Sequence, residues 1–538
     1  MNSRTFSVAV LLILAAAAFL RGAWLTADPP VRRAVGIVWH DEGAWVHNAR
    51  NQVLWGTWRT DEWNPVFIAP VFTALEYASF ATLGVGTWQA RAVPAVSGLV
   101  AVVALMIGLH VLGGRRAAVI GGALLASNYA FVMWNRAALM ESTMTACMVV
   151  AWMAWAVWRR DSTPHRDPAA RHRLIRQAAF AAVGLAAGAA LVGLLFVLPH
   201  WSDYQFYNWQ MSVTRKPTYT LGAFVDRATW LPIVQGLFSR MPIELVAGLT
   251  GLTALAIGWR WARPAERLLV FWILFGLAEL VVHDSGNERR YVMFIPAIIA
   301  LASLLLARSS ALFAPGRHMK RTTAVAVVAL VLPLAYLAIG SLLRPFLMED
   351  IDAGQLRLPV RLSAAGALVV TTLVAWRGAR LLHWAGRRAI PLRVVAGLVM
   401  TAVVWNGMQW VDWAATRTTV NHDASIALGA AVPDGALVQG KLANGMALEN
   451  RIRPLFVGNT FGNYADRLQR DDARYILTYD LPRIGYESSD GSGLIQGILD
   501  HYPSRRVVAT FPVDETRMED RAVLIDKFPD DSPAHARD

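Results

Sequence analysis

Two adjacent carboxylates, Asp41 and Glu42, open the first polar stretch of a chain that otherwise carries long apolar runs. Trp45, Val46 and Ala49 fall on or near one helical face after them, which predicts a helix on a bilayer surface. A carboxylate there is usually functional, for example as a general base, although a solvated helix start is the alternative. Adjacent helical residues point about 100° apart. We therefore assign the base to Asp41 and a structural or secondary catalytic role to Glu42.

Two later polar stretches carry groups suited to an anion. One holds Arg136 and Glu141, and the other holds the pair Arg289 and Arg290. Guanidinium groups bind phosphate through two parallel hydrogen bonds, so the pair is a candidate clamp for the phosphate or diphosphate of a lipid-linked donor. The alternative is that one arginine reaches lipid headgroups or pairs with Glu288. Glu141 is a candidate second acid, or a helix-start carboxylate, and Arg136 is a further candidate phosphate ligand.

Aromatic and polar residues near these stretches are candidate substrate ligands. Residues 201–210 are dense in aromatic rings, of which Trp201 and Tyr204 could stack on a sugar. A membrane aromatic belt has the same composition, and we favour the belt. Further candidates beside the arginine pair are His283, Asp284 and Glu288. No HExxH or comparable ligand spacing is present, so the sequence specifies no cofactor, and a divalent metal stays open.

The class of protein follows from composition. Hydrophobic residues make up 55% of the chain, charged residues make up 17%, and there are 22 tryptophans, which is typical of a multi-span helical membrane protein. The net charge of +13 lies mainly in short loops between apolar runs, which argues against a nucleic-acid partner. The only cysteine, Cys147, excludes an intrachain disulfide.

About eleven spans are expected by the ~20-residue rule. They cover residues 7–25, 92–112, 117–134, 146–158, 178–198, 243–259, 268–282, 292–307, 323–343, 362–376 and 394–411. Residues 65–84 are instead expected to form a re-entrant or interfacial helix. The first run is expected to remain as an uncleaved helix.

Loop charge predicts the orientation in the cell inner (plasma) membrane. The most basic loop, residues 159–176, fits the cytoplasm, which also places the N-terminus there. All three polar stretches then lie at the outer face, where Arg289 and Arg290 break the usual charge asymmetry. Residues 1–413 form the predicted membrane domain.

Beyond residue 413 no spanning run occurs. Short β-rich segments appear at residues 436–439, 475–479, 506–511 and 522–525, separated by helical or turn-rich stretches. These predict a small extracytoplasmic α/β domain over residues 414–538. No GxGxxG or P-loop pattern is present there, so nothing supports chemistry on a soluble nucleotide.

The order and spacing of these motifs resemble the GT-C glycosyltransferases, and within them the protein O-mannosyltransferase and aminoarabinose-lipid A transferase group. The quoted motifs are the acidic pair, Arg136…Glu141, the Arg290-Tyr291 pair with Pro296 opening a later span, and Leu83-Gly84-Val85…Trp88-Gln89-Ala90-Arg91-Ala92-Val93-Pro94. The resemblance covers about Ser7 to Arg308. It implies a GT-C-like fold and an inverting sugar transfer from a polyprenyl-phosphate carrier. It also implies that Asp41 is the base and that Arg289, Arg290 and Tyr291 lie near the lipid phosphate.

The chain departs from that group at two points. Asn64-Pro65-Val66 stands where members close to the lipid A transferases have Lys-Pro-Pro, which removes a phosphate-binding lysine, and Glu141 stands where Asp is common. The expected partners are a polyprenyl-phosphate sugar donor, a glycan, lipid or protein acceptor, and membrane lipids. The alternative function is a transporter or flippase of a lipid-linked solute, although no internal repeat is evident. A third possible function is a polysaccharide polymerase or ligase, which would catalyse a closely related reaction.

Overall fold

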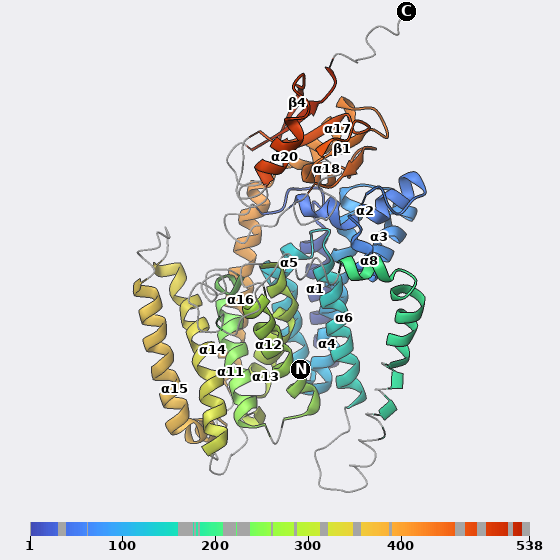
Figure 1. Cartoon of the computed structure of the whole chain (residues 1–538). Coiled ribbons are helices and arrows are strands. Elements are labelled where there is room, and N and C mark those ends of the chain that lie inside the picture. The colour runs from blue at the N-terminus through green and yellow to red at the C-terminus, as the bar shows by residue number, and fades with distance from the viewer. Residues whose placement is uncertain are drawn as a thin grey trace, which may run out of the picture.

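A bundle of apolar helices lies beneath a small sheet region in the computed structural model (Figure 1). The structure describes residues 2–30, 39–61, 63–159, 176, 179–180, 183–184, 186–207, 222, 237–259, 262–283, 288–312, 321–347, 357–386, 390–457, 468–480, 491–514 and 520–529. The bundle helices are α1 (Ser3–Gly22), α4 (Thr87–Ser127), α5 (Tyr129–Trp134), α6 (Met140–Trp158), α11 (Pro242–Ile257), α12 (Pro264–His283), α13 (Ile295–Leu312), α14 (Arg321–Leu347), α15 (Arg357–Gly386) and α16 (Leu392–Thr416). Shorter helical turns are η2 (Gly193–Val197), α8 (Trp201–Gln205), η5 (Leu237–Arg240) and η6 (Glu288–Phe294).

The helices confirm the predicted class of multi-span membrane protein. Within the described ranges, six helices are long and apolar enough to cross a membrane, and three shorter apolar helices cover residues 186–197, 242–256 and 328–343. Two predicted spans, 92–112 and 117–134, correspond to the two halves of α4 together with α5. The predicted span 178–198 lies partly outside the described residues.

A sharp reversal at Gly114 folds α4 back on itself. Gly114 has φ 74°, a left-handed conformation that a residue without Cβ adopts readily. The two halves then pack closely, since a Cβ on Gly121 would lie 2.1 Å from the Leu109 side chain. A Cβ on Gly122 would lie 2.6 Å from Met106. The turn therefore lies at the opposite end of the first half of α4 from Thr87. Arg115 and Arg116 directly follow Gly114 at this turn.

A middle layer separates the bundle from the sheet region. It contains α2 (His40–Trp55), η1 (Pro65–Phe67) and α3 (Pro70–Leu83), and Figure 1 shows it beneath the strands. The sequence pattern predicts α2 on a bilayer surface, but nearly all of its residues from His40 to Asn51 are buried. The reason is that the sheet region covers the face that would otherwise meet solvent or lipid.

The sheet region confirms the predicted small α/β fold. Its elements are α17 (Val420–Ala431), β1 (Leu437–Gln439), α18 (Lys441–Gly445), β2 (Arg453–Leu455), β3 (Tyr475–Tyr479), α20 (Gly491–Leu499), β4 (Arg506–Pro512) and β5 (Arg521–Asp526). The strand order is β2-β1-β3-β5-β4. The first three strands pair in parallel, and β5 pairs antiparallel with both β3 and β4. The predicted boundary at residue 413 lies in the last turn of α16, just before this region.

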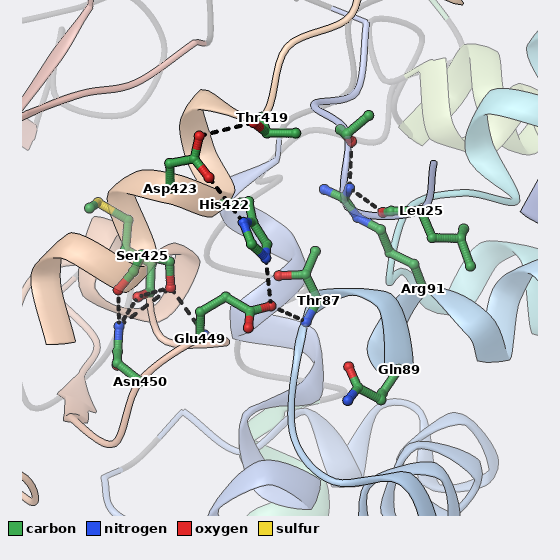
Figure 2. Close-up of polar contacts among 12 residues, drawn as sticks. Leu25, Thr87, Gln89, Arg91, Thr419, His422, Asp423, Ser425, Glu449 and Asn450 are labelled. Atoms are coloured by element: carbon green, nitrogen blue, oxygen red, sulfur yellow. Dashed lines mark hydrogen bonds and ion pairs between the residues drawn. The ribbon is translucent and has the colours of Figure 1, made fainter. Parts of the chain in front are cut away.

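Polar contacts join the sheet region to the layers below. The Glu449 carboxylate accepts a hydrogen bond of 2.6 Å from the backbone N–H of Thr87, the first residue of α4 (Figure 2). A helix start has unpaired N–H groups, so a carboxylate stabilises it. His422 lies between Glu449 and Asp423, 3.6 Å from the first and 3.2 Å from the second. This cluster ties α17 and the loop after α18 to the top of the bundle.

Arg50 makes a second and more deeply buried connection. Its guanidinium, on α2, donates to the backbone carbonyls of Ala447, Asn450 and Ile452, each at 2.9 Å. The side chain is 1% exposed. Because a buried guanidinium requires its hydrogen-bond partners, this contact fixes α2 against the loop that follows α18.

Candidate functional site

The candidate site is centred on the Asp41 carboxylate at the start of α2. One oxygen of Asp41 lies 3.1 Å from Nη1 of Arg289. The other oxygen lies 3.3 Å from Nζ of Lys441. Arg289 comes from η6 and Lys441 from α18, so one carboxylate joins the middle layer, the bundle and the sheet region.

The second predicted acid joins the same cluster. Oε1 of Glu141, in the first turn of α6, lies 3.7 Å from Nε of Arg289. The other carboxylate oxygen of Glu141 is buried and has no hydrogen-bond partner among the described residues. The three polar stretches that the sequence analysis singled out therefore meet at Arg289, with a carboxylate on either side of its guanidinium.

The electrostatics of the cluster keep Asp41 ionised. Burial raises the pKa of the Asp41 carboxyl, but the charges of Lys441 and Arg289, with a smaller contribution from His40, outweigh that effect and hold this pKa well below its usual range. Asp41, Arg289 and Lys441 are 17%, 20% and 15% exposed, so the cluster is largely screened from solvent but still reachable.

Glu42 faces a different set of groups from its neighbour. Its carboxylate forms two hydrogen bonds of 2.8 and 2.6 Å with Arg91 of α4. It also accepts from the backbone N–H of Ala138 at 2.7 Å. The side chain is 2% exposed. Through these hydrogen bonds, Glu42 connects α2 to α4 and to the stretch before α6.

Successive residues of η6 point in different directions. A 3₁₀ helix has three residues per turn, so neighbours lie about 120° apart. Arg289 points to Asp41, whereas Arg290 lies 3.4 Å from Glu279 of α12. Tyr291 is fully buried and stacks on Phe238, with ring centroids 5.7 Å apart. Of these three candidate phosphate ligands, Arg289 is the one that the described contacts place at the Asp41 cluster.

The described contacts of Arg136 are with groups outside the cluster. Its guanidinium donates to the carbonyls of Leu20, Arg21 and Trp24 at the end of α1, at 2.9–3.1 Å. It also lies over the Trp413 ring, 4.5 Å from the centroid. A cation placed at a helix C-terminus satisfies its unpaired carbonyls, so the structure gives Arg136 a helix-capping position.

The aromatic candidates lie beside the segment that follows α2. Trp201 on α8 is 54% exposed, and Tyr204 is half-buried. Asp203 on the same helix pairs with Arg59 at 2.6 Å, which ties α8 to the loop after α2. Tyr207 accepts from the backbone N–H of Asn64 at 2.9 Å. These contacts bring the aromatic stretch beside the middle layer, although none of them reaches Asp41.

The three remaining candidates, His283, Asp284 and Glu288, lie at or within a gap between the described residues. His283 ends α12 and Glu288 begins η6, while Asp284 lies outside the described residues. Across the described ranges, no group of three or more His, Cys, Asp or Glu side chains is placed to hold a metal ion.

Sequence reasoning missed Lys441 and Arg91. Lys441 lies 400 residues from Asp41 in a region without a recognised motif, and only the tertiary fold brings the two together. Arg91 stands in the Trp88–Pro94 stretch that was quoted for the resemblance, and its pairing with Glu42 was not foreseen. One available signal was that Lys441 is one of only four lysines in a chain whose basic residues are otherwise arginine.

The fold and the cluster define a polytopic membrane protein with an acidic and basic site at one end of its helical bundle. Residues 68–232 match the family model described as dolichyl-phosphate-mannose-protein mannosyltransferase. This match confirms the predicted resemblance to the GT-C glycosyltransferases, and it covers α3, α4, α5 and α6, with Arg91 and Glu141.

Solved structures of similar proteins were also found. ArnT from Cupriavidus metallidurans in the apo state is 18% identical, with 96% of this chain and 97% of that chain covered at a TM-score of 0.49. The same protein bound to undecaprenyl phosphate is 16% identical, with 98% of both chains covered at 0.48. An Archaeoglobus fulgidus oligosaccharyltransferase in the apo form is 13% identical, with 89% and 70% covered at 0.40. No curated protein sequence matches the chain.

Proposed function

We propose that this protein is a membrane glycosyltransferase that moves a sugar from a polyprenyl-phosphate-linked donor to an acceptor hydroxyl at the outer face of the membrane. The observation that carries this proposal is the meeting of Asp41, Glu141 and Arg289 from three separate polar stretches. A carboxylate beside a guanidinium provides both a proton acceptor and a phosphate ligand. The family match over residues 68–232 supports the same class of reaction.

In the proposed reaction, Asp41 takes the proton from the acceptor hydroxyl. The acceptor oxygen forms a bond to the anomeric carbon of the sugar, and the bond between that carbon and the phosphate oxygen breaks. The electron pair of the broken bond stays on the phosphate, which leaves as the polyprenyl phosphate and gains negative charge. Arg289 stabilises that charge, since it can turn from Asp41 to the phosphate. Attack opposite to the leaving group inverts the anomeric configuration.

Donor binding would also make Asp41 a stronger base. In the donor-free protein, Arg289 and Lys441 hold the pKa of Asp41 low against the opposing effect of burial, and a carboxyl with a low pKa is a weak base. A phosphate that attracts these cations would weaken their hold on Asp41. The basicity of Asp41 would then rise when the donor is in place.

The remaining roles follow from position. We assign residues 1–413 to a catalytic membrane domain and residues 414–538 to an extracytoplasmic domain that covers its outer end. The N-terminus is placed in the cytoplasm, and the inner membrane is the proposed location. Trp201 and Tyr204, on the exposed side of the middle layer, are assigned to the approach of the acceptor or sugar.

A transfer assay in proteoliposomes tests the proposal. Purified full-length protein is supplied with a panel of radiolabelled polyprenyl-phosphate sugars and with hydroxyl-bearing acceptors, and the labelled product is measured for the wild type and Asp41→Asn. We expect release of polyprenyl phosphate and transfer of label by the wild type alone. If the protein instead moves an intact lipid-linked sugar across the bilayer without cleaving it, the transporter function replaces the enzyme.

A further inference from the structure

Lys441 is the first residue of α18 and the only group from the sheet region that the described contacts place on Asp41. Its Nζ lies 3.3 Å from Oδ1 of Asp41, opposite the oxygen that contacts Arg289. The two cations therefore approach the same carboxylate from different sides. The side chain of Lys441 is 15% exposed, so its charge acts in a partly desolvated setting where pairing with an anion is stronger than in water.

The backbone on either side of Asp41 enforces this placement. A Cβ on Gly43 would lie 1.8 Å from the backbone oxygen of Asn444, and a Cβ on Gly445 would lie 2.7 Å from Cα of His40. The start of α2 and the end of α18 therefore touch through two glycines. Together with the three hydrogen bonds of Arg50, this contact leaves Lys441 little freedom to move away from the site.

The described charges of the cluster favour a second cation beside a phosphate. Among the described contacts, Asp41 and Glu141 bring two carboxylates and Arg289 brings one guanidinium, a combination that does not favour an anion. Lys441 adds a positive charge to this set. Arg290 is paired with Glu279 and Arg136 caps α1, so the described contacts place neither of them at this cluster.

We propose that Lys441, which belongs to the sheet region, is a second phosphate-binding residue of the donor site. This inference rests on the proposed function. When the bond from phosphate to the anomeric carbon breaks, the lipid phosphate gains a negative charge. Lys441 and Arg289 then bind it from two sides while the acceptor proton resides on Asp41, so the sheet region takes part directly in the reaction.

Binding of polyprenyl phosphate to the full-length protein in phosphatidylcholine nanodiscs tests this role. The ligands are polyprenyl phosphate, the same polyprenol without phosphate, and phosphatidylglycerol as a competing lipid phosphate. Lys441→Ala should weaken binding of polyprenyl phosphate at least about tenfold, the range of a charge-assisted hydrogen bond, and leave polyprenol binding unchanged. Lys441→Arg should retain most of the affinity. The matched control is Arg470→Ala, which removes a half-buried cation paired with Asp472 in the same region.

A double variant separates direct contact from an indirect effect of charge. If Lys441 only neutralises Asp41, then adding Lys441→Ala to Asp41→Asn should cost no further affinity, and this result would overturn the proposal. Direct contact predicts a further loss in that background. Lys441→Gln keeps much of the side-chain length and replaces Lys441→Ala if the melting temperature shows that the alanine variant is unfolded.

The outcomes also distinguish this inference from the function on which it rests. If the wild type binds polyprenyl phosphate no better than polyprenol, the proposed donor site is wrong. If the wild type prefers polyprenyl phosphate and Arg289→Ala loses that preference while Lys441→Ala keeps it, only the role of Lys441 is wrong. Equal competition by phosphatidylglycerol would assign the site to general lipid phosphates and overturn the polyprenyl-phosphate ligand.

Discussion

Asp41 and Glu42 are neighbours with different surroundings, so their removal should have different consequences. Asp41→Asn keeps the shape of the side chain but cannot accept a proton, and we expect kcat to fall by about 10²–10⁴-fold in a protein that still folds. Glu42→Gln breaks a buried ion pair with Arg91 and should cost about 3–5 kcal/mol of unfolding free energy. Single-turnover transfer rates and thermal unfolding measure the two effects. Near-normal turnover in Asp41→Asn, with loss in Glu141→Gln, would move the base to Glu141.

The pH dependence of transfer should report the cations around Asp41. A lowered pKa keeps the carboxylate ionised as the pH falls, so in the wild type the Asp41-dependent acid limb of kcat/KM should lie below the usual range for Asp. Lys441→Ala removes the largest of the effects that lower this pKa, and the opposing effect of burial then raises it. The acid limb should therefore move to higher pH. An unchanged limb in Lys441→Ala would show that another group controls it.

At the scale of elements, η6 shows which parts of the site could be predicted from the sequence. Basic residues in a stretch predicted to lie on the outer side break the usual charge asymmetry, and that signal selected Arg289, which contacts Asp41. It could not separate Arg289 from Arg290 and Tyr291, because the direction of each side chain depends on a 3₁₀ helix that the sequence pattern did not reveal. The position of Arg136 at the end of α1 could not be foreseen for a similar reason, since a guanidinium that caps a helix and one that binds a phosphate have the same local sequence.

The contact between α2 and α18 should control both stability and donor binding. Gly43→Ala places a Cβ against backbone that cannot rotate away, so the two helices must separate, at a cost of about 1–3 kcal/mol. Because Lys441 moves with α18, the affinity for polyprenyl phosphate should fall as well. Gly407→Ala in α16 is the matched control, since nothing lies within 4 Å of its Cβ position. Thermal unfolding and lipid binding measure both effects, and wild-type values for Gly43→Ala would contradict this account.

For the whole molecule, composition and periodicity predicted more than any single motif did. Apolar runs and basic loops were sufficient for the bundle, and short β-rich segments were sufficient for four of the five strands in the described sheet, β2 being missed. The burial of α2 could not be foreseen, because it depends on the sheet region that covers it. The same long-range packing places Lys441 on Asp41, and residues 400 positions apart leave no local pattern in one sequence.

The two ends of the molecule differ in charge, and this difference predicts its orientation in the membrane. Residues 87–113 of α4 rise ~1.5 Å each, so the turn at Gly114 lies about 40 Å from the helix start that Glu449 contacts. Arg115 and Arg116 are at that turn, and both Arg263 and Arg308 donate to the nearby Leu112 carbonyl. Basic residues from the α4 turn, from α13 and from the segment before α12 therefore gather at the end opposite the site, as expected for the cytoplasmic side.

Cysteine labelling tests this orientation in a background where Cys147, the only natural cysteine, is replaced by serine. Ser504→Cys lies at an exposed position just before β4, and Arg116→Cys lies at an exposed position in the α4 turn. A membrane-impermeant maleimide added to intact cells should modify Ser504→Cys and should modify Arg116→Cys only after permeabilisation. The reverse pattern would place Asp41, Arg289 and Lys441 in the cytoplasm. A polyprenyl-linked donor would then have to be used before it is flipped, and an extracytoplasmic acceptor would be excluded.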